Sequence, residues 1–203
     1  MSGIAELRHL VPTHTGAGET VDWIRAAAVW GTRLPDDYVA FITEYGEGHI
    51  SEFLYIFNPL STKGDESLSQ MLMETKTARA LAAQLPGPWE LHEPPSAPLI
   101  AWGVTSGPDI LCWLTTDKDP DQWPVVVFGR HTASLPTIYN CGMAEFLRRV
   151  FLADFDECPM SGLDLWDLAS PKFLHWREEQ RLWDSGINPW TGEASPYAGM
   201  EWD

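Results

Sequence analysis

The chain has 203 residues and a mass of 22.8 kDa, a size typical of one domain with appendages. Hydrophobic residues make up 44%, and the eleven Trp, eight Phe and five Tyr supply enough apolar surface for a core, which excludes disorder of the whole chain. With 13 Lys+Arg and 29 Asp+Glu, the formal net charge is -16. This charge disfavours nucleic acid or an anionic membrane as the partner and favours a basic protein.

The start of the chain and its cysteines bear on the compartment. The first residues contain no apolar stretch typical of a signal peptide, and they include Glu6 and Arg8. Apolar runs such as Ala26 to Trp30 fall far below the ~20 residues that span a bilayer. Three scattered cysteines favour a reducing compartment over a disulfide framework. We therefore expect a cytoplasmic protein.

Two helices are expected first in chain order. The first runs from Thr20, as N-cap, to Trp30, and Gly31 is placed to end it. The second begins at Pro35 and ends at Gly46. Its apolar side chains recur at helical spacing, at Tyr38, Phe41, Ile42 and Tyr45.

A strand, a helix and a loop follow. The aromatic and β-branched run 53–57 predicts a strand, which Asn58-Pro59 ends. Spaced apolar residues predict a helix over about 66–85. Five prolines in residues 86–98 predict a loop.

Three more strands are expected at 99–105, 110–115 and 124–128, the first two joined as a hairpin. The apolar runs at 53–57, 110–114 and 125–128 are continuous, which is typical of strands covered on both faces. An extended piece at 137–139 then precedes a helix whose buried face is marked by Met143, Phe146, Leu147, Val150 and Phe151.

The composition changes after residue 152. Eleven acids and three bases give this segment a net charge of -8, and it contains five of the tryptophans. Residues 172–184 predict an amphipathic helix with Phe173, Trp176 and Trp183 on one side, followed after Gly186 by extended chain with turns. Because acidic and aromatic residues are combined, we expect the segment to pack on the domain or on a partner.

Motifs for catalysis or metal binding are absent from the sequence. Gly16-Ala-Gly18 lacks the Gly-Lys-Ser/Thr of a phosphate-binding loop, and there is no G-x-S-x-G, H-E-x-x-H or C-x-x-C. The six histidines are dispersed, which disfavours a zinc site. We predict no enzymatic activity, no metal and no cofactor.

Two further features resemble sites but favour structural roles. Asp117, Asp119 and Asp121 alternate as in a calcium loop, yet Gln122 and Phe128 stand where that loop requires Gly and Glu, so we expect a solvated loop between strands. Residues within or beside strands are expected in the core. They are Cys112, Trp102, Trp113 and Trp123.

Residues 30–50, with Phe53-Leu54 and Asn58-Pro59 after them, follow the pattern G..LP.DY..F...YG.G.I and then a strand. This pattern resembles that of a known family, the SUKH superfamily. The matching positions are Gly31, Leu34, Pro35, Tyr38, Gly46 and Gly48. Further matches lie at 100–103, 110–113, 123–127, Tyr139 and 145–147, so the resemblance covers residues 20–152.

The resemblance implies an α+β fold with a mostly antiparallel sheet of about four to six strands flanked by helices. It implies a SUKH-like domain over residues 20–152, with an N-terminal extension at 1–19 and an acidic, Trp-rich extension at 153–203. It also implies a non-enzymatic role, because bacterial members resemble immunity proteins that bind and neutralise polymorphic toxins, often nucleases. The family offers no catalytic residues to carry over.

We therefore expect a protein that neutralises a basic toxin by direct binding. The alternative is an intracellular regulatory or scaffolding module unrelated to toxins; an enzyme would require a deep pocket with perturbed titratable groups. A basic partner would be attracted by acidic clusters. The positions expected to contact it are Glu44, Glu47, Glu52, Asp117, Asp119 and Asp121.

Overall fold

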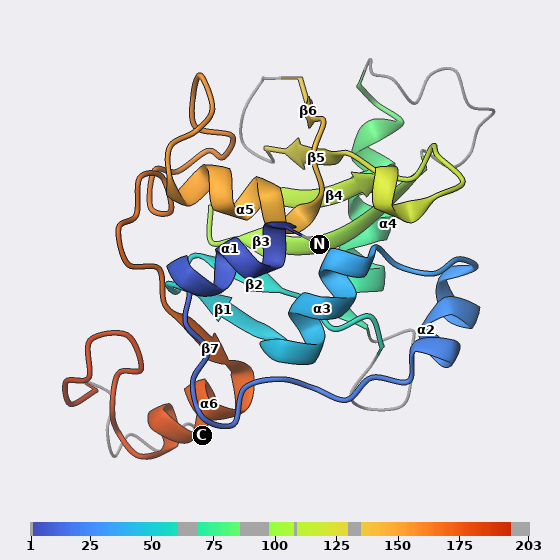
Figure 1. The fold of residues 1–203 in the computed structure, drawn as a ribbon. Coiled ribbons are helices and arrows are strands. Elements are labelled where there is room, and N and C mark those ends of the chain that lie inside the picture. The colour runs from blue at the N-terminus through green and yellow to red at the C-terminus, as the bar shows by residue number, and fades with distance from the viewer. Residues whose placement is uncertain (1, 61–68, 86–97, 108, 130–134, 196–203) are drawn as a thin grey trace.

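The structure, a computed structural model, describes residues 2–60, 69–85, 98–107, 109–129 and 135–195 (Figure 1). Its strands are β1 (Gly48–Ile50), β2 (Leu54–Ile56), β3 (Leu99–Thr105), β4 (Ile110–Leu114), β5 (Val125–Phe128), β6 (Thr137–Tyr139) and β7 (Phe173–His175). Its α-helices are α1 (Ser2–Leu10), α2 (Trp23–Trp30), α3 (Asp36–Glu44), α4 (Gln70–Ala82), α5 (Met143–Phe151) and α6 (Trp176–Asp184), and η3 (Pro120–Gln122) is a 3-10 turn.

The strands form one sheet in the order β6-β5-β4-β3-β2-β1-β7, and every neighbouring pair is antiparallel. The predicted α+β class is confirmed. The sheet has seven strands, where the sequence predicted about four to six, because β1 and β7 were not expected as strands. These two short strands pair with each other at one end of the sheet.

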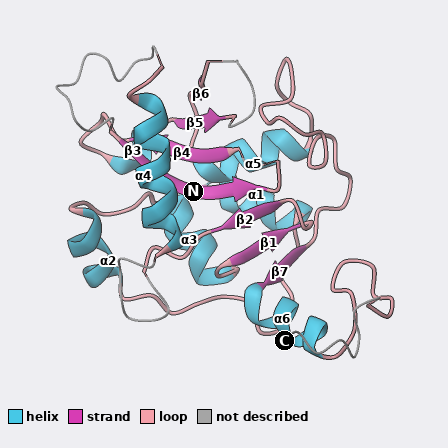
Figure 2. Ribbon diagram, turned by 180° about the vertical axis from the view of Figure 1, so that it is seen from behind, coloured by secondary structure: helices cyan, strands magenta, loops and turns pink. Residues whose placement is uncertain are grey.

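Helices lie on both faces of the sheet (Figures 1 and 2). Helices α1, α3 and α5 pack together on one face, whereas α4 lies on the other face against β3 and β4. All residues of β4 and β5 are buried, so the cover on both faces that their continuous apolar runs predicted is confirmed. The same prediction was wrong for 53–57, because Tyr55 in β2 is only partly buried. On the face that carries α4, β1, β2 and β7 lie to one side of the helix and not beneath it (Figure 2).

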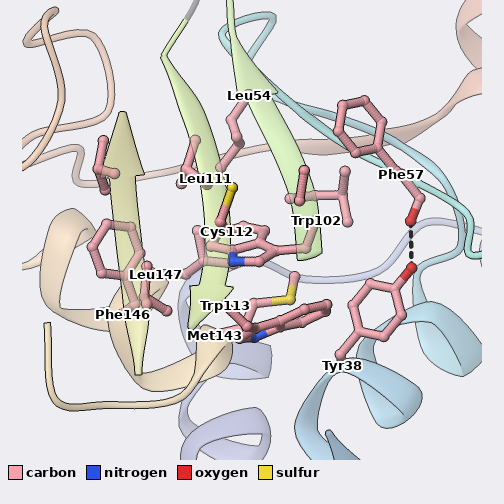
Figure 3. Packing of buried hydrophobic residues seen from close by; sticks show 14 of the residues in the cluster. Tyr38, Leu54, Phe57, Trp102, Leu111, Cys112, Trp113, Met143, Phe146 and Leu147 are labelled. Atoms are coloured by element: carbon pink, nitrogen blue, oxygen red, sulfur yellow. Dashed lines mark hydrogen bonds between the residues drawn. The ribbon is translucent and has the colours of Figure 1, made fainter. Parts of the chain in front are cut away.

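The aromatic core lies where α3 and α5 meet the centre of the sheet (Figure 3). The rings of Trp102 and Trp113 have centroids 6.2 Å apart, and the ring of Tyr38 meets Trp113 edge-on at 5.0 Å. The Tyr38 hydroxyl donates a hydrogen bond of 2.6 Å to the Phe57 carbonyl. The core positions predicted for Trp102, Trp113, Trp123 and Cys112 are confirmed, since all four are at most 4% exposed.

The observed helix ends agree with the predicted ones in part. Helix α2 ends as predicted at Gly31, which has a left-handed φ of 72°. Its N-cap is Asp22, whose carboxylate accepts the Arg25 N–H at 2.9 Å, so the predicted start at Thr20 was wrong. In α3 the predicted stripe is confirmed, because Tyr38, Phe41, Ile42 and Tyr45 are all fully buried. Helix α4 lies within the predicted span 66–85, while residues 61–68 and the predicted loop at 86–97 are outside the described part.

Two segments outside residues 20–152 take part in the fold. Helix α1, which the sequence did not predict, packs on α5 and buries Leu7 completely. The prediction of a continuous helix over 172–184 was wrong at its start, because Phe173–His175 is a strand and α6 begins at Trp176. Phe173 lies edge-on against Phe41 and Tyr45 of α3, with centroids 5.8 and 5.3 Å away, and this packing together with pairing to β1 outweighs the helical pattern.

A very close backbone approach joins β7 to β1. A Cβ atom on Gly48 would lie 2.1 Å from the Leu174 carbonyl oxygen and 2.9 Å from the His175 Cα. Only glycine leaves room for β7 at this distance.

Removing the Tyr38 hydroxyl should destabilise the core without changing its shape. In Tyr38→Phe the Phe57 carbonyl loses a buried donor, so we expect the free energy of unfolding to fall by about 1–2 kcal/mol. Urea denaturation followed by Trp fluorescence measures this loss. Tyr139→Phe is the comparison variant, because it loses a bond to the Thr137 side chain at the partly exposed β6; equal effects of the two variants would contradict the larger contribution expected of the buried bond.

Gly48→Ala should disrupt the β1–β7 pairing. The added Cβ would collide with backbone atoms of Leu174 and His175, which cannot move aside as a side chain can. We therefore expect the free energy of unfolding to fall by about 1–3 kcal/mol or more, as it does when other cores are overpacked. Amide hydrogen exchange should report early opening of Phe173–His175. Gly107→Ala is the control, because its Cβ would meet nothing closer than the Thr105 Oγ1 at 3.6 Å. An unchanged stability in Gly48→Ala would refute the close approach.

Candidate functional site

The acidic residues predicted to contact a partner fall into different environments. Both oxygens of Glu44 accept from Arg8 Nε at 2.7 Å. Asp119 and Asp121 both accept from Arg33 Nη2, at 2.5 and 2.8 Å. The guanidinium lowers the pKa of Asp121. Three of the six predicted carboxylates therefore have arginine partners within the chain.

The remaining predicted acids are separated from one another. Asp117 is exposed and accepts the Asp119 N–H at 2.8 Å, at the start of the loop that contains η3. Glu52 is exposed in the β1–β2 turn, where its φ is 67°. Glu47 is mostly enclosed beside β2. The structure thus brings Asp117, Asp119 and Asp121 together but leaves Glu44, Glu47 and Glu52 in three separate places.

A second polar group lies where β1, β2 and α6 meet, and we call it the sheet-end cluster. Its members are Glu19, Glu47, His49, Tyr55, Asn58, His175, Arg177 and Glu179. Of these residues, only Glu47 was predicted from the sequence to contact a partner.

Glu19 is the centre of this cluster. Its carboxylate is 8% exposed and accepts from the Glu47 N–H at 3.1 Å, from Asn58 Nδ2 at 2.9 Å and from Arg177 Nη2 at 3.0 Å. These bonds join the loop before α2, the end of β2 and the first turn of α6. Glu19 therefore links three segments that are far apart in the sequence.

Glu47 and Tyr55 form the next contact. The Tyr55 hydroxyl donates to the Glu47 carboxylate. Burial raises the pKa of Glu47 above its usual value, and the nearby Glu19 carboxylate adds to this effect. Burial also raises the pKa of Tyr55, so the phenol stays protonated and serves as the donor.

His49 lies beside Tyr55 and is held by α6. Its Nδ1 is 2.6 Å from Glu179 Oε2, and the two side chains are 30% and 16% exposed. Its ring meets Tyr55 edge-on at 4.6 Å and Trp190 at 6.2 Å. The imidazole is thus fixed by a carboxylate on one side and aromatic rings on two others.

His175 ties β7 to the N-terminal segment. Its side chain is 1% exposed, and its backbone N–H donates to His14 Nε2 at 3.0 Å. Its ring Nδ1 accepts the Arg177 backbone N–H at 3.1 Å and thereby caps the start of α6. Its Nε2 is 3.8 Å from Glu19 Oε1. Burial lowers the pKa of His175, because the enclosed ring loses the water that would stabilise its charged form.

A shallow hollow of 260 Å³ opens beside this cluster, on the face of the sheet that carries α4. Cross-strand pairing places His49 opposite Tyr55 and Tyr55 opposite Val104, so these side chains share one face. The lining residues are His49, Glu52, Phe53, Tyr55, Gln70, Val104, Thr105 and Ser106. The site combines carboxylate, imidazole and aromatic groups, a chemistry suited to holding a cation or a hydrogen-bond donor.

Sequence signals for this site are weak. His49 and Tyr55 alternate with buried neighbours in β1 and β2, a pattern that places them on one sheet face. Glu179 lies 130 residues after His49, and Arg177 lies 158 residues after Glu19. No local motif connects such pairs, so the cluster arises only from the tertiary structure.

Comparisons add no relative to these findings: no family model, curated protein or solved structure matches the chain. Within the described ranges, no group of three or more His, Cys, Asp or Glu residues is placed to hold a metal ion. No helix formed by the described residues is long and apolar enough to cross a membrane.

The stability of the chain should depend on the protonation of His175. Because its folded pKa is lowered, the neutral ring stabilises the fold above its ordinary pKa of 6.5, and this contribution is lost as the pH falls through the folded value. We expect the melting temperature to fall more steeply below pH 6.5 in the wild type than in His175→Asn, where the amide retains the N-cap. Circular dichroism melts at pH 8, 7, 6 and 5 measure this difference.

His9→Asn, at an exposed ring in α1, is the control and should keep the wild-type slope. Parallel slopes for the wild type and His175→Asn would show that His175 does not contribute to the pH dependence.

Proposed function

We propose that this chain is a non-enzymatic protein-binding domain that neutralises a basic toxin by direct binding, with a nuclease as the toxin class that fits its charge. Two arguments support this beyond the α+β fold: the resemblance of residues 20–152 to the SUKH superfamily, whose bacterial members include immunity proteins, and the distribution of charge over the surface.

The charge distribution is the observation that carries the proposal. Six arginines form ion pairs within the chain: Arg8, Arg33, Arg148, Arg149, Arg177 and Arg181. These pairs engage six of the 13 bases, and each pair also occupies at least one acid, so the surplus of the 29 acids over the 13 bases remains to face a partner. A basic partner would be attracted and oriented by this field.

One exposed segment concentrates this surplus, and we call it the acidic loop (residues 153–172). Asp156, Glu157, Asp164 and Asp167 are exposed in it, and no ion pair joins them to a base among the described residues. Leu163 stands among them with 70% of its surface exposed. Buried Asp109 anchors the loop by accepting the Ser161 N–H at 2.8 Å and the Ser161 hydroxyl. An anchored loop with acidic rim and apolar tip has the composition of a protein-binding surface.

Capture of the partner tests the proposal directly. The tagged chain is incubated with lysate of its native host and washed at low and high salt, and the retained proteins are identified by mass spectrometry. We expect one basic, toxin-like protein near 1:1 stoichiometry, lost as salt rises. Co-expression with that protein should restore growth of poisoned cells. Recovery of regulatory or envelope proteins alone, without rescue, would support a regulatory module unrelated to toxins instead.

Charge reversal in the acidic loop should slow association. With the captured partner, Glu157→Lys/Asp164→Lys should lower the association rate constant about tenfold at low salt, and the difference should shrink at high salt because screening removes steering. Asp184→Lys/Glu193→Lys, which reverses two exposed acids after β7, is the matched control. Equal rates for both double variants would exclude the acidic loop, and Asp117→Lys then tests the predicted cluster around η3.

A further inference from the structure

We infer that the hollow on the α4-side face of the sheet, between His49, Glu52 and Tyr55, is a receptor for an arginine side chain presented by a basic protein partner. This inference rests on the proposed function and extends it by naming a contact. The hollow would recognise one cationic side chain of the partner, whereas attraction over the whole surface depends only on the partner's net charge.

The shape of the hollow fits one long side chain. Its 260 Å³ lie at a place where α4 no longer covers the sheet, and Gln70, the first residue of α4, borders it. Phe53 and Tyr55 provide aromatic lining, and Val104, Thr105 and Ser106 border the hollow from β3 and the turn after it. A planar guanidinium packs on aromatic surface more favourably than a compact ammonium does.

The charges around the hollow favour a cation. Exposed Glu52 is one of its lining residues, and none of the described residues that line it is a lysine or arginine. Two further carboxylates stand behind its wall, Glu47 on Tyr55 and Glu179 on His49. The neighbouring Arg177 donates to Glu19 and Lys172 Nζ donates to the Pro189 carbonyl at 2.8 Å, so both nearby cations have other partners. Among the described residues, no cationic side chain lines the hollow to pair with an anionic ligand.

The wall of the hollow is held in place before any partner arrives. Glu179 accepts from His49 Nδ1, so in the neutral ring Nε2 carries the lone pair and is an acceptor. Glu47 fixes the Tyr55 hydroxyl, and the edge-on contact at 4.6 Å fixes the two rings against each other. A preorganised set of acceptors loses little entropy on binding, which favours specific recognition of one donor-rich side chain.

A second copy of this chain is the other occupant to consider. Two copies would each carry a formal net charge of -16, so their approach is opposed by repulsion. An arginine from a basic partner has the opposite electrostatic sign and fits the observations better.

Small probes test the inference on the full chain. N-acetyl-arginine amide, its neutral isostere N-acetyl-citrulline amide and N-acetyl-lysine amide are titrated into isotope-labelled protein, and NMR shift changes are recorded. We expect saturable changes at His49, Tyr55 and Thr105 with the arginine probe, weaker ones with lysine and none with citrulline. Glu52→Gln should weaken arginine binding about tenfold, the loss expected for one charge-assisted hydrogen bond. Glu193→Gln, at an exposed acid of the last segment, should leave the affinity unchanged.

Several outcomes would overturn the site. Equal responses to arginine and citrulline, shift changes spread over the exposed acids, or equal affinities for Glu52→Gln and Glu193→Gln would each do so, as would a dimer in sedimentation that buries His49. A captured toxin that binds Glu52→Gln as tightly as wild type would also overturn the site while the proposed function stands. Specific arginine binding in a chain that rescues no poisoned cells would overturn the proposed function and keep the site.

Discussion

The close approach of β7 to β1 is the constraint on which the candidate site depends. A Cβ on Gly48 would collide with the Leu174 carbonyl, and one on Gly46 would lie 2.5 Å from His175 Cδ2. Because both positions are glycine, β7 pairs with β1, and α6 begins directly after it. That start brings Glu179 to His49. Gly46 and Gly48 thus decide where β7 and the start of α6 lie.

The same geometry leaves part of one sheet face without cover from the described residues. On the side of α1, α3 and α5, Phe173 extends the aromatic core and buries the end of the sheet against α3. On the other side a single helix, α4, lies against β3 and β4. The polar residues of β1 and β2 on that side are covered in part by the segment after β7, through Trp190 and Glu179. The hollow lies between these two covers.

Some acidic side chains pair with arginines of the same chain, and the others are left to contact a partner. Arg8 engages Glu44, and Arg33 engages both Asp119 and Asp121 across 86 and 88 residues of sequence. These pairs hold α1 and the η3 loop to the segments around α3. Exposed pairs of this kind contribute little to stability individually, yet they reduce the negative field where they occur. In the acidic loop, Arg148 and Arg149 pair with Asp154 in this way, whereas Asp156, Glu157, Asp164 and Asp167 have no arginine partner among the described residues.

The sequence alone determined α3, β3, β4, β5 and α5, as well as the buried tryptophans, because helical spacing and continuous apolar runs are local signals that agree with the final packing. It also determined the surplus of negative charge. Only the tertiary structure decided the strands β1 and β7, the partners of Glu44 and Asp121, and the cluster around Glu19. These features join residues 36 to 158 positions apart or depend on room for a backbone, and periodicity along the chain carries no information about such contacts.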